Sequence, residues 1–176
     1  VEITPTDDAM VRGGGFESTN FGNSESLMVK QKKSSVSRED LNRRSFLKFD
    51  ISGIQGSIAT ASVQLVAMGA QSASKVSICQ VTEEWSESTI TWLNQPSYGS
   101  SLGDKDIPPK GQYVQWDVAA HLQQLINNSE TALSLALDGS PGIDQYSSFY
   151  SKESSNEAQR PKLYVDYDDV VATTTT

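Results

Sequence analysis

Four basic residues stand at positions from which they could bind a carboxylated polymer: Arg12, Lys30, Lys48 and Lys152. The first three occur in segments where apolar and polar residues alternate, and Lys152 shares its parity with Tyr150. If these segments are neighbouring strands, the four cations line up across the outer face of one sheet. Like charges on adjacent strands repel. Such a row suits an acidic polymer instead, because Arg holds a carboxylate through two parallel hydrogen bonds.

Much of the remaining positive charge has a simpler interpretation. Seven of the fourteen Lys and Arg residues lie within the nineteen positions 30–48. For residues 31–43 we interpret the bases as part of a solvated loop that forms salt bridges with Glu39 and Asp40. The bases at strand positions are therefore the better candidates for binding.

Two tryptophans in the stretch EEWSESTITWLNQP (83–96) offer a second kind of binding chemistry, because aromatic rings can stack on sugars. Trp85 and Trp92 are seven residues apart, so on one continuous strand they would face opposite ways. We therefore interpret both as packing anchors and expect Trp85 to be the more exposed of the two.

The composition excludes several classes of function. The formal net charge is -8 and the pI is about 4.6, which argues against nucleic acid as a partner. No stretch approaches the ~18 consecutive apolar residues of a membrane-spanning helix. Cys79 and His121 are the single cysteine and the single histidine, so neither an intrachain disulfide nor a Cys- or His-pair metal site can form. We expect a monomeric segment of a larger secreted or cell-surface protein.

The elements that must position these residues are mostly strands. Short alternating segments bounded by turn residues predict an all-β protein, an antiparallel β-sandwich of jelly-roll type. The stretch DVAAHLQQLINN predicts one short helix over residues 117–128, with Asp117 as its N-cap. We expect one domain over residues 1–169 and the start of a Thr-rich linker over 170–176. The predicted strands are 9–14, 26–30, 45–52, 60–68, 74–81, 89–92, 113–118, 132–139, 147–152 and 162–167.

Several segments together resemble one family. The opening DDAMVRGGGFESTNFGNSESLMVK, the block RRSFLKFDISGIQGSIATASVQL, the stretch VTEEWSESTITWLNQP, the strand WDV and the close FYSKESSNEAQRPKLYVDY are similar to the DNRLRE-type domain. Carbohydrate-binding module family 96 is the characterised branch of that domain, and the resemblance covers roughly residues 7–167. It implies a jelly-roll β-sandwich attached to secreted polysaccharide lyases, hydrolases or surface proteins.

The resemblance also implies binding of an acidic polysaccharide such as alginate. Arg12, Lys30 and Lys48 match basic positions of the family, and Lys152 stands where the family usually has Arg, which removes the two-pronged grip there. Asn20 and Tyr150 are expected to hydrogen-bond hydroxyls or to pack on a sugar ring. The predicted function is a non-catalytic module that brings a larger enzyme or surface protein to such a polymer.

Other functions stay open. A structural Ca²⁺ is common in jelly-roll sugar-binding modules, and hard carboxylate ligands are available, although no ligand set can be assigned. Catalysis by Glu83, Glu84 and Glu87 is disfavoured, because all three lie in one segment rather than across a cleft. A structural or adhesive spacer without sugar binding is the main alternative, and adhesion would need an apolar patch around Met10, Met28 and Phe46. The carboxylates that could serve Ca²⁺ are Asp7, Asp8, Asp50, Asp117 and those of residues 166–169.

Overall fold

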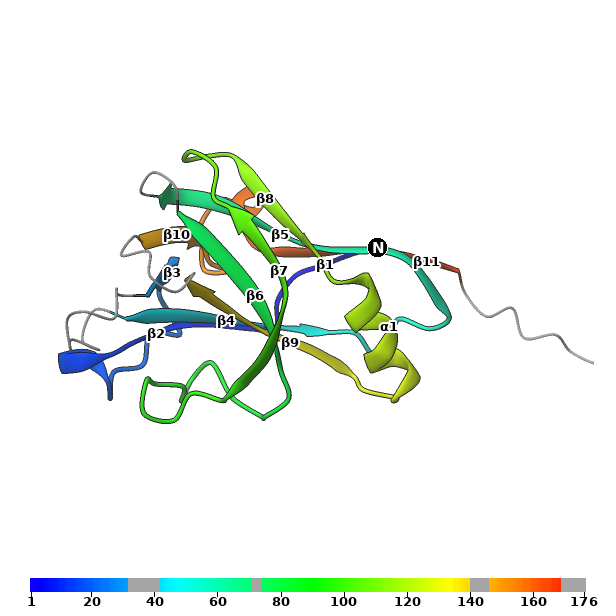
Figure 1. The fold of residues 1–176 in the computed structure, drawn as a ribbon, viewed down its shortest axis with the longest axis horizontal. Helices are drawn as coiled ribbons and strands as arrows, with labels where there is room; N and C mark the ends of the chain where they lie inside the picture. Colours follow the sequence, from blue (N-terminus) through cyan, green and yellow to red (C-terminus); the bar gives the residue numbers. More distant parts are fainter. Residues whose placement is uncertain (32–41, 71–73, 140–145, 169–176) are drawn as a thin grey trace, which may run out of the picture.

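A computed structural model describes residues 1–31, 42–70, 74–139 and 146–168. Within them the chain forms one antiparallel sheet of eleven strands that curls into a sandwich, together with one α-helix and two short 3-10 helices (Figure 1). The all-β antiparallel class is therefore confirmed. The elements are β1 (Glu2–Ile3), β2 (Asp7–Arg12), η1 (Gly14–Phe16), β3 (Ser26–Lys30), β4 (Arg43–Asp50), β5 (Ser57–Ala70), β6 (Lys75–Val81), β7 (Tyr98–Asp106), β8 (Tyr113–Asp117), α1 (Ala119–Asn127), β9 (Ala132–Gly139), β10 (Tyr146–Tyr150), η3 (Glu157–Gln159) and β11 (Lys162–Asp168).

Two long strands organise the sandwich. β4 pairs with β2 on one side and β9 on the other, and β6 and β7 continue that layer. β5 pairs with β8, β11 and β10, and these strands lie above β4 and β9 in Figure 1. β3 pairs along its whole length with β10, while only its last residue pairs with β4, so it closes one end of the sandwich.

One predicted strand is absent, and one observed strand was not predicted. Residues 89–92 form turns rather than a strand, because the backbone N–H groups of Thr89 and Ile90 both bond back to Ser86 O. The missed strand β7 is the polar stretch YGSSLGDKD at the sheet edge, where little alternation is required because few of its side chains are buried. The predicted helix is present as α1, but its N-cap is Val118 rather than Asp117, which instead accepts the backbone N–H of Ala119 at 2.9 Å. The predicted linker, residues 170–176, lies outside the described residues.

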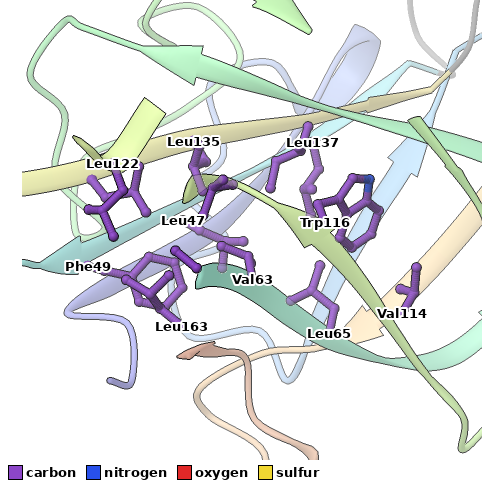
Figure 2. Close-up of a cluster of buried hydrophobic side chains, with 14 of the residues drawn as sticks. Leu47, Phe49, Val63, Leu65, Val114, Trp116, Leu122, Leu135, Leu137 and Leu163 are labelled. Carbon is purple, nitrogen blue, oxygen red and sulfur yellow. The ribbon is translucent and has the colours of Figure 1, made fainter. Parts of the chain in front are cut away.

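The main core fills the space between the layers. Alternate residues of β4, β5, β8 and β9 point inward, and Trp116, Phe49 and Phe149 are fully buried there (Figure 2). Each large apolar side chain contributes roughly 1.5–3 kcal/mol when buried. This core therefore accounts for the rigidity of the two layers that carry the candidate site.

A second apolar cluster lies on the opposite face of β2, β4, β9 and β6. It is covered by residues 82–97, called here the tryptophan loop, which supplies Trp85 and Ile90. In Figure 1 this loop is the green segment beneath β4 and β9. The alternation predicts that the outer face of these strands is open to solvent, but the tryptophan loop covers part of it. The cluster consists of Ala9, Val11, Phe46, Cys79, Val81, Trp85, Ile90 and Ala136.

Candidate functional site

Three cations meet where β2, β3 and β4 end together. Arg12 is directly opposite Arg43 in the β2–β4 pairing, and Lys30 pairs with Arg43 at the end of β3. Opposed residues of paired strands carry their Cβ atoms about 5 Å apart on one face. We call Arg12, Arg43 and Lys30 the basic cluster. All three are partly exposed, and Tyr146, which pairs with Lys30, is 39% exposed beside them.

The two arginines lie in an environment that lacks an anion among the described residues. Burial lowers the pKa of Arg43, and the charge of Arg12 lowers it further. The Nε atoms of both arginines are buried and have no hydrogen-bond partner in the described part of the chain. A carboxylate bound to both guanidinium groups would offset their mutual repulsion. The chemistry offered is therefore anion binding.

An exposed aromatic ring borders the basic cluster. η1 follows β2 directly, and it turns the chain so that the Phe16 ring stacks on Arg12, with 3.9 Å between Cζ and the ring centroid. Gly14 makes this turn possible, because its φ of 67° lies in the left-handed region. Phe16 remains 43% exposed and its ring centroid lies 6.3 Å from that of Phe21.

Lys48, a predicted binding residue, lies on the other face of β4, where it is opposite Asp7. Its Nζ donates to the backbone oxygen of Trp85, lies 4.9 Å from the Trp85 ring centroid and is 3.5 Å from Glu84 Oε2. Only 16% of the side chain is exposed. In the structure Lys48 therefore fastens the tryptophan loop to the sheet.

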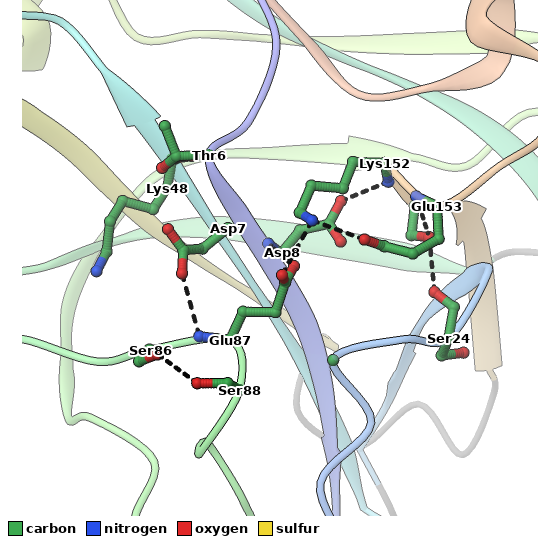
Figure 3. A network of polar contacts seen from close by, with 12 residues as sticks. Thr6, Asp7, Asp8, Ser24, Lys48, Ser86, Glu87, Ser88, Lys152 and Glu153 are labelled. Carbon is green, nitrogen blue, oxygen red and sulfur yellow. Dashed lines mark hydrogen bonds and ion pairs between the residues drawn. The ribbon is translucent and has the colours of Figure 1, made fainter.

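Lys152 is also held by its neighbours. Its Nζ lies 2.9 Å from Glu87 Oε2 and 2.7 Å from Glu153 Oε1 (Figure 3). Burial alone would lower the pKa of Lys152, but the bonds to Glu153 and Glu87 outweigh this and raise it. The four predicted cations therefore do not form one row. The structure brings Arg12 and Lys30 together and places Lys48 and Lys152 elsewhere.

Asp8 completes the polar group around Lys152. It accepts the backbone N–H of Lys152 at 2.7 Å, and its own N–H donates to Glu87 Oε1 at 2.9 Å. Burial raises the pKa of Asp8 to about 8, because the Lys152 N–H opposes this only in part and the charges of Glu153 and Glu87 add to it. We call Asp8, Lys48, Glu87, Lys152 and Glu153 the loop clamp, because together they join β2, β4, the tryptophan loop and the turn after β10.

Neither of the two predicted polar sugar contacts belongs to the basic cluster. Asn20 Nδ2 donates to the backbone oxygens of Glu87 and Ile90 at 2.7 and 2.8 Å, so its amide holds the tryptophan loop. Tyr150 is half-buried and pairs with Ser26, at the end of β10 opposite to Tyr146. Their predicted contacts with sugar stay predictions.

The relative exposure of the two tryptophans is the reverse of the prediction. Trp85 is 7% exposed, packs against Phe46 and donates its Nε1–H to Ser134 Oγ at 2.8 Å. Trp92 is partly exposed and covers Arg44, with 4.8 Å between the guanidinium carbon and the ring centroid. Trp85 is thus a packing anchor, as predicted, but the expectation that it is the more exposed ring is wrong. The turn at residues 86–90 allows Trp85 to enter the apolar cluster.

Carboxylates suited to a metal occur together once in the described part of the chain, where oxygens of Asp8, Glu87 and Glu153 lie within 4.8 Å of one another. The ammonium of Lys152 already lies between two of them, so a Ca²⁺ bound there would have to displace it. Asp50 and Asp117 instead accept nearby backbone N–H groups. This group fits an ion-pair network better than a metal site, and the structural Ca²⁺ stays a prediction.

Sequence reasoning missed Arg43, which it assigned to a solvated loop. The signal was present, because continuing the alternation of Leu47 and Ser45 backwards places Arg43 on the same face. Lys32, Lys33 and Arg38, the other bases of that stretch, lie outside the described residues.

Comparisons with known proteins find a relative by sequence and a neighbour among solved structures. A gellan lyase from Bacillus sp is 29% identical over 177 residues, which cover 96% of this chain and 7% of that protein. This chain therefore spans a small part of the relative. Among solved structures, the CBM22-1 and GH10 modules of the N-terminal endo-1,4-β-D-xylanase 10B of Clostridium thermocellum, complexed with xylohexaose, are 7% identical. That match covers 88% of this chain and 29% of the other, with a TM-score of 0.30.

Within the described residues, no helix has the length and apolar character needed to cross a membrane. The sequence model of carbohydrate-binding module family 96 matches residues 1–167, nearly the whole described fold. The chain belongs to carbohydrate-binding module family 96.

Proposed function

We propose that the chain is a non-catalytic module that binds an acidic polysaccharide through the basic cluster. The observation that carries this proposal is the juxtaposition of Arg12, Arg43 and Lys30, with two buried guanidinium Nε–H donors that have no acceptor in the described structure. A chain with a net charge of -8 has no general need for such a cluster. A carboxylate ligand would stabilise it.

The parent protein is part of the same proposal. The gellan lyase relative is about fourteen times longer than the matched module, since the match covers 7% of it. We infer that this module likewise belongs to a larger secreted protein and holds that protein on its polysaccharide. Alginate and gellan both carry carboxylates, and either polymer would suit two neighbouring arginines.

Affinity electrophoresis in gels that contain alginate, gellan or a neutral glucan tests the proposal. The wild-type protein should be retarded by the acidic polymers alone, and Arg12→Ala/Arg43→Ala should lose most of that retardation. Retardation should also fall with added salt, because exposed ion pairs contribute only ~0–1 kcal/mol each and are screened. Lys105→Ala is a suitable control, because it removes an exposed cation from β7 at the far end of the strand order.

A structural spacer is a second candidate function, because two of the predicted binding cations, Lys48 and Lys152, form ion pairs within the loop clamp. It predicts no retardation in any gel. Equal retardation in acidic and neutral gels would contradict the charge mechanism.

A further inference from the structure

The basic cluster has a neighbour of different chemistry. The Phe16 ring, 43% exposed, presents an aromatic surface directly beside the guanidinium group of Arg12. Contacts with Arg12 and Phe21 hold the ring in place, so little conformational freedom remains to be lost on binding. Exposed aromatic rings are costly in water and are typical of surfaces that bind a ligand with an apolar face. Sugar rings have such a face.

The surroundings of Phe16 disfavour a second carboxylate. Glu17 follows Phe16 in the chain and is exposed, and its backbone oxygen accepts the N–H of Leu93 at 3.2 Å. Leu93 is 65% exposed, so the residue that follows Phe16 and the residue bonded to it are acidic and apolar rather than basic. When Arg12 and Arg43 already hold one carboxylate, a second charged sugar on Phe16 would gain no further counter-charge from Glu17 or Leu93.

We infer that the ligand is an acidic heteropolysaccharide in which a carboxylated sugar on Arg12 and Arg43 adjoins an uncharged sugar stacked on Phe16. This inference rests on the proposed function and narrows its substrate class. A polymer with a carboxylate on every sugar uses the arginines alone. A polymer with uncharged sugars between the charged ones uses both surfaces.

Gellan and alginate separate these cases, because gellan has uncharged sugars beside each carboxylated one whereas every alginate sugar carries a carboxylate. The dissociation constants of wild-type protein, Phe16→Ala and Phe16→Tyr for both polymers test the inference. Phe16→Ala should weaken gellan binding about fivefold to tenfold, the range expected for one aromatic contact. Phe16→Ala should weaken alginate binding by less than about twofold. Any effect that the ring has on the position of Arg12 is then limited to this amount.

Phe16→Tyr, which keeps a flat ring, should retain wild-type affinity for gellan. Tyr113→Ala removes an even more exposed aromatic side chain (63%) from β8, a strand that pairs with β5, and should change neither affinity. Equal losses on the two polymers, or no loss on gellan, would overturn the inference while leaving the proposed function intact. A wild-type protein that binds neither polymer would overturn the proposed function and this inference together.

Discussion

The basic cluster and the loop clamp both contain cationic side chains. The cations of the clamp have acidic or polar partners, whereas the two arginines of the cluster repel each other. In the loop clamp, Lys152 is ion-paired with Glu87 and Glu153, and Lys48 donates to a backbone oxygen and faces an aromatic ring. In the basic cluster, Arg12 and Arg43 repel each other and keep buried Nε–H donors without acceptors in the described residues. The ion pairs of the loop clamp stabilise the fold, whereas two neighbouring arginines that repel each other support the proposed anion-binding role of the basic cluster.

The largest effect on stability is expected at the centre of the loop clamp. Lys152→Ala leaves the partly buried carboxylates of Glu87 and Glu153 without their cation and should lower the free energy of unfolding by about 3 kcal/mol. Urea denaturation measures this change. Lys75→Ala is the matched control, because the Lys75–Asp106 pair is exposed and 3.8 Å apart, so its loss should cost less than about 1 kcal/mol. If Lys152→Ala and Lys75→Ala both cost less than about 1 kcal/mol, the loop clamp is only a surface contact.

A backbone contact tests the same region without touching a charge. A Cβ atom on Gly22 would lie 2.4 Å from the backbone oxygen of Glu87, so Gly22→Ala must push the tryptophan loop away. We expect a loss of about 1–3 kcal/mol in urea denaturation, the usual cost of overpacking. At Gly53 a Cβ meets nothing within 4 Å, and Gly53→Ala should be nearly neutral. A neutral Gly22→Ala would contradict the close packing of the loop.

The pH dependence of stability separates the two regions further. Because the pKa of Asp8 is raised from 3.8 to about 8, the folded protein holds this proton more tightly than the unfolded chain. The contribution of Asp8 is thus fully present below pH 4 and is lost as the pH rises through about 8. Relative to wild type, Asp8→Asn should gain stability between pH 5 and pH 8, by up to about 1.4 kcal/mol for each pH unit.

Thermal and urea unfolding at several pH values measure that relative gain. Asp50→Asn is the control, because hydrogen bonds to Ser52 lower the pKa of the exposed Asp50 and its titration lies below this window. A constant difference between Asp8→Asn and wild type from pH 5 to pH 8 would contradict a protonated Asp8.

The smallest effect on stability is expected in the basic cluster. Arg43→Ala removes a side chain that is repelled by Arg12, so the free energy of unfolding should change by less than about 1 kcal/mol. A loss above 2 kcal/mol in urea denaturation would show that Arg43 is a structural residue like Lys152. The comparison between the two regions would then fail.

The sequence predicts the fold well and the site only in part. Alternation places Leu47 and Phe49 in the main core correctly, because burial on one face of a strand has a period of two. It could not show that the other face of β4 is roofed, since this depends on the path of residues 82–97 across distant strands. The partners of Lys48 and Lys152 come from that loop and from the turn after β10, so their ion pairs were equally hidden.

At Arg43 the sequence pattern favours a solvated loop, whereas the structure places the residue in the basic cluster. Its neighbours Lys32, Lys33 and Arg38 suggested a solvated charge run, and a charge run is usually that. Only the pairing of β4 with β2 shows that Arg43 lies opposite Arg12, a residue 31 positions away.

Retardation of Arg43→Ala and Lys48→Ala in alginate and gellan gels, compared at a temperature where both remain folded, tests the central claim most directly. Each variant removes one cation from β4, on opposite faces. The account predicts that Arg43→Ala loses most of the retardation while Lys48→Ala keeps it. Loss in Lys48→Ala together with full retardation of Arg43→Ala would place the binding surface on the face of the tryptophan loop and contradict the account.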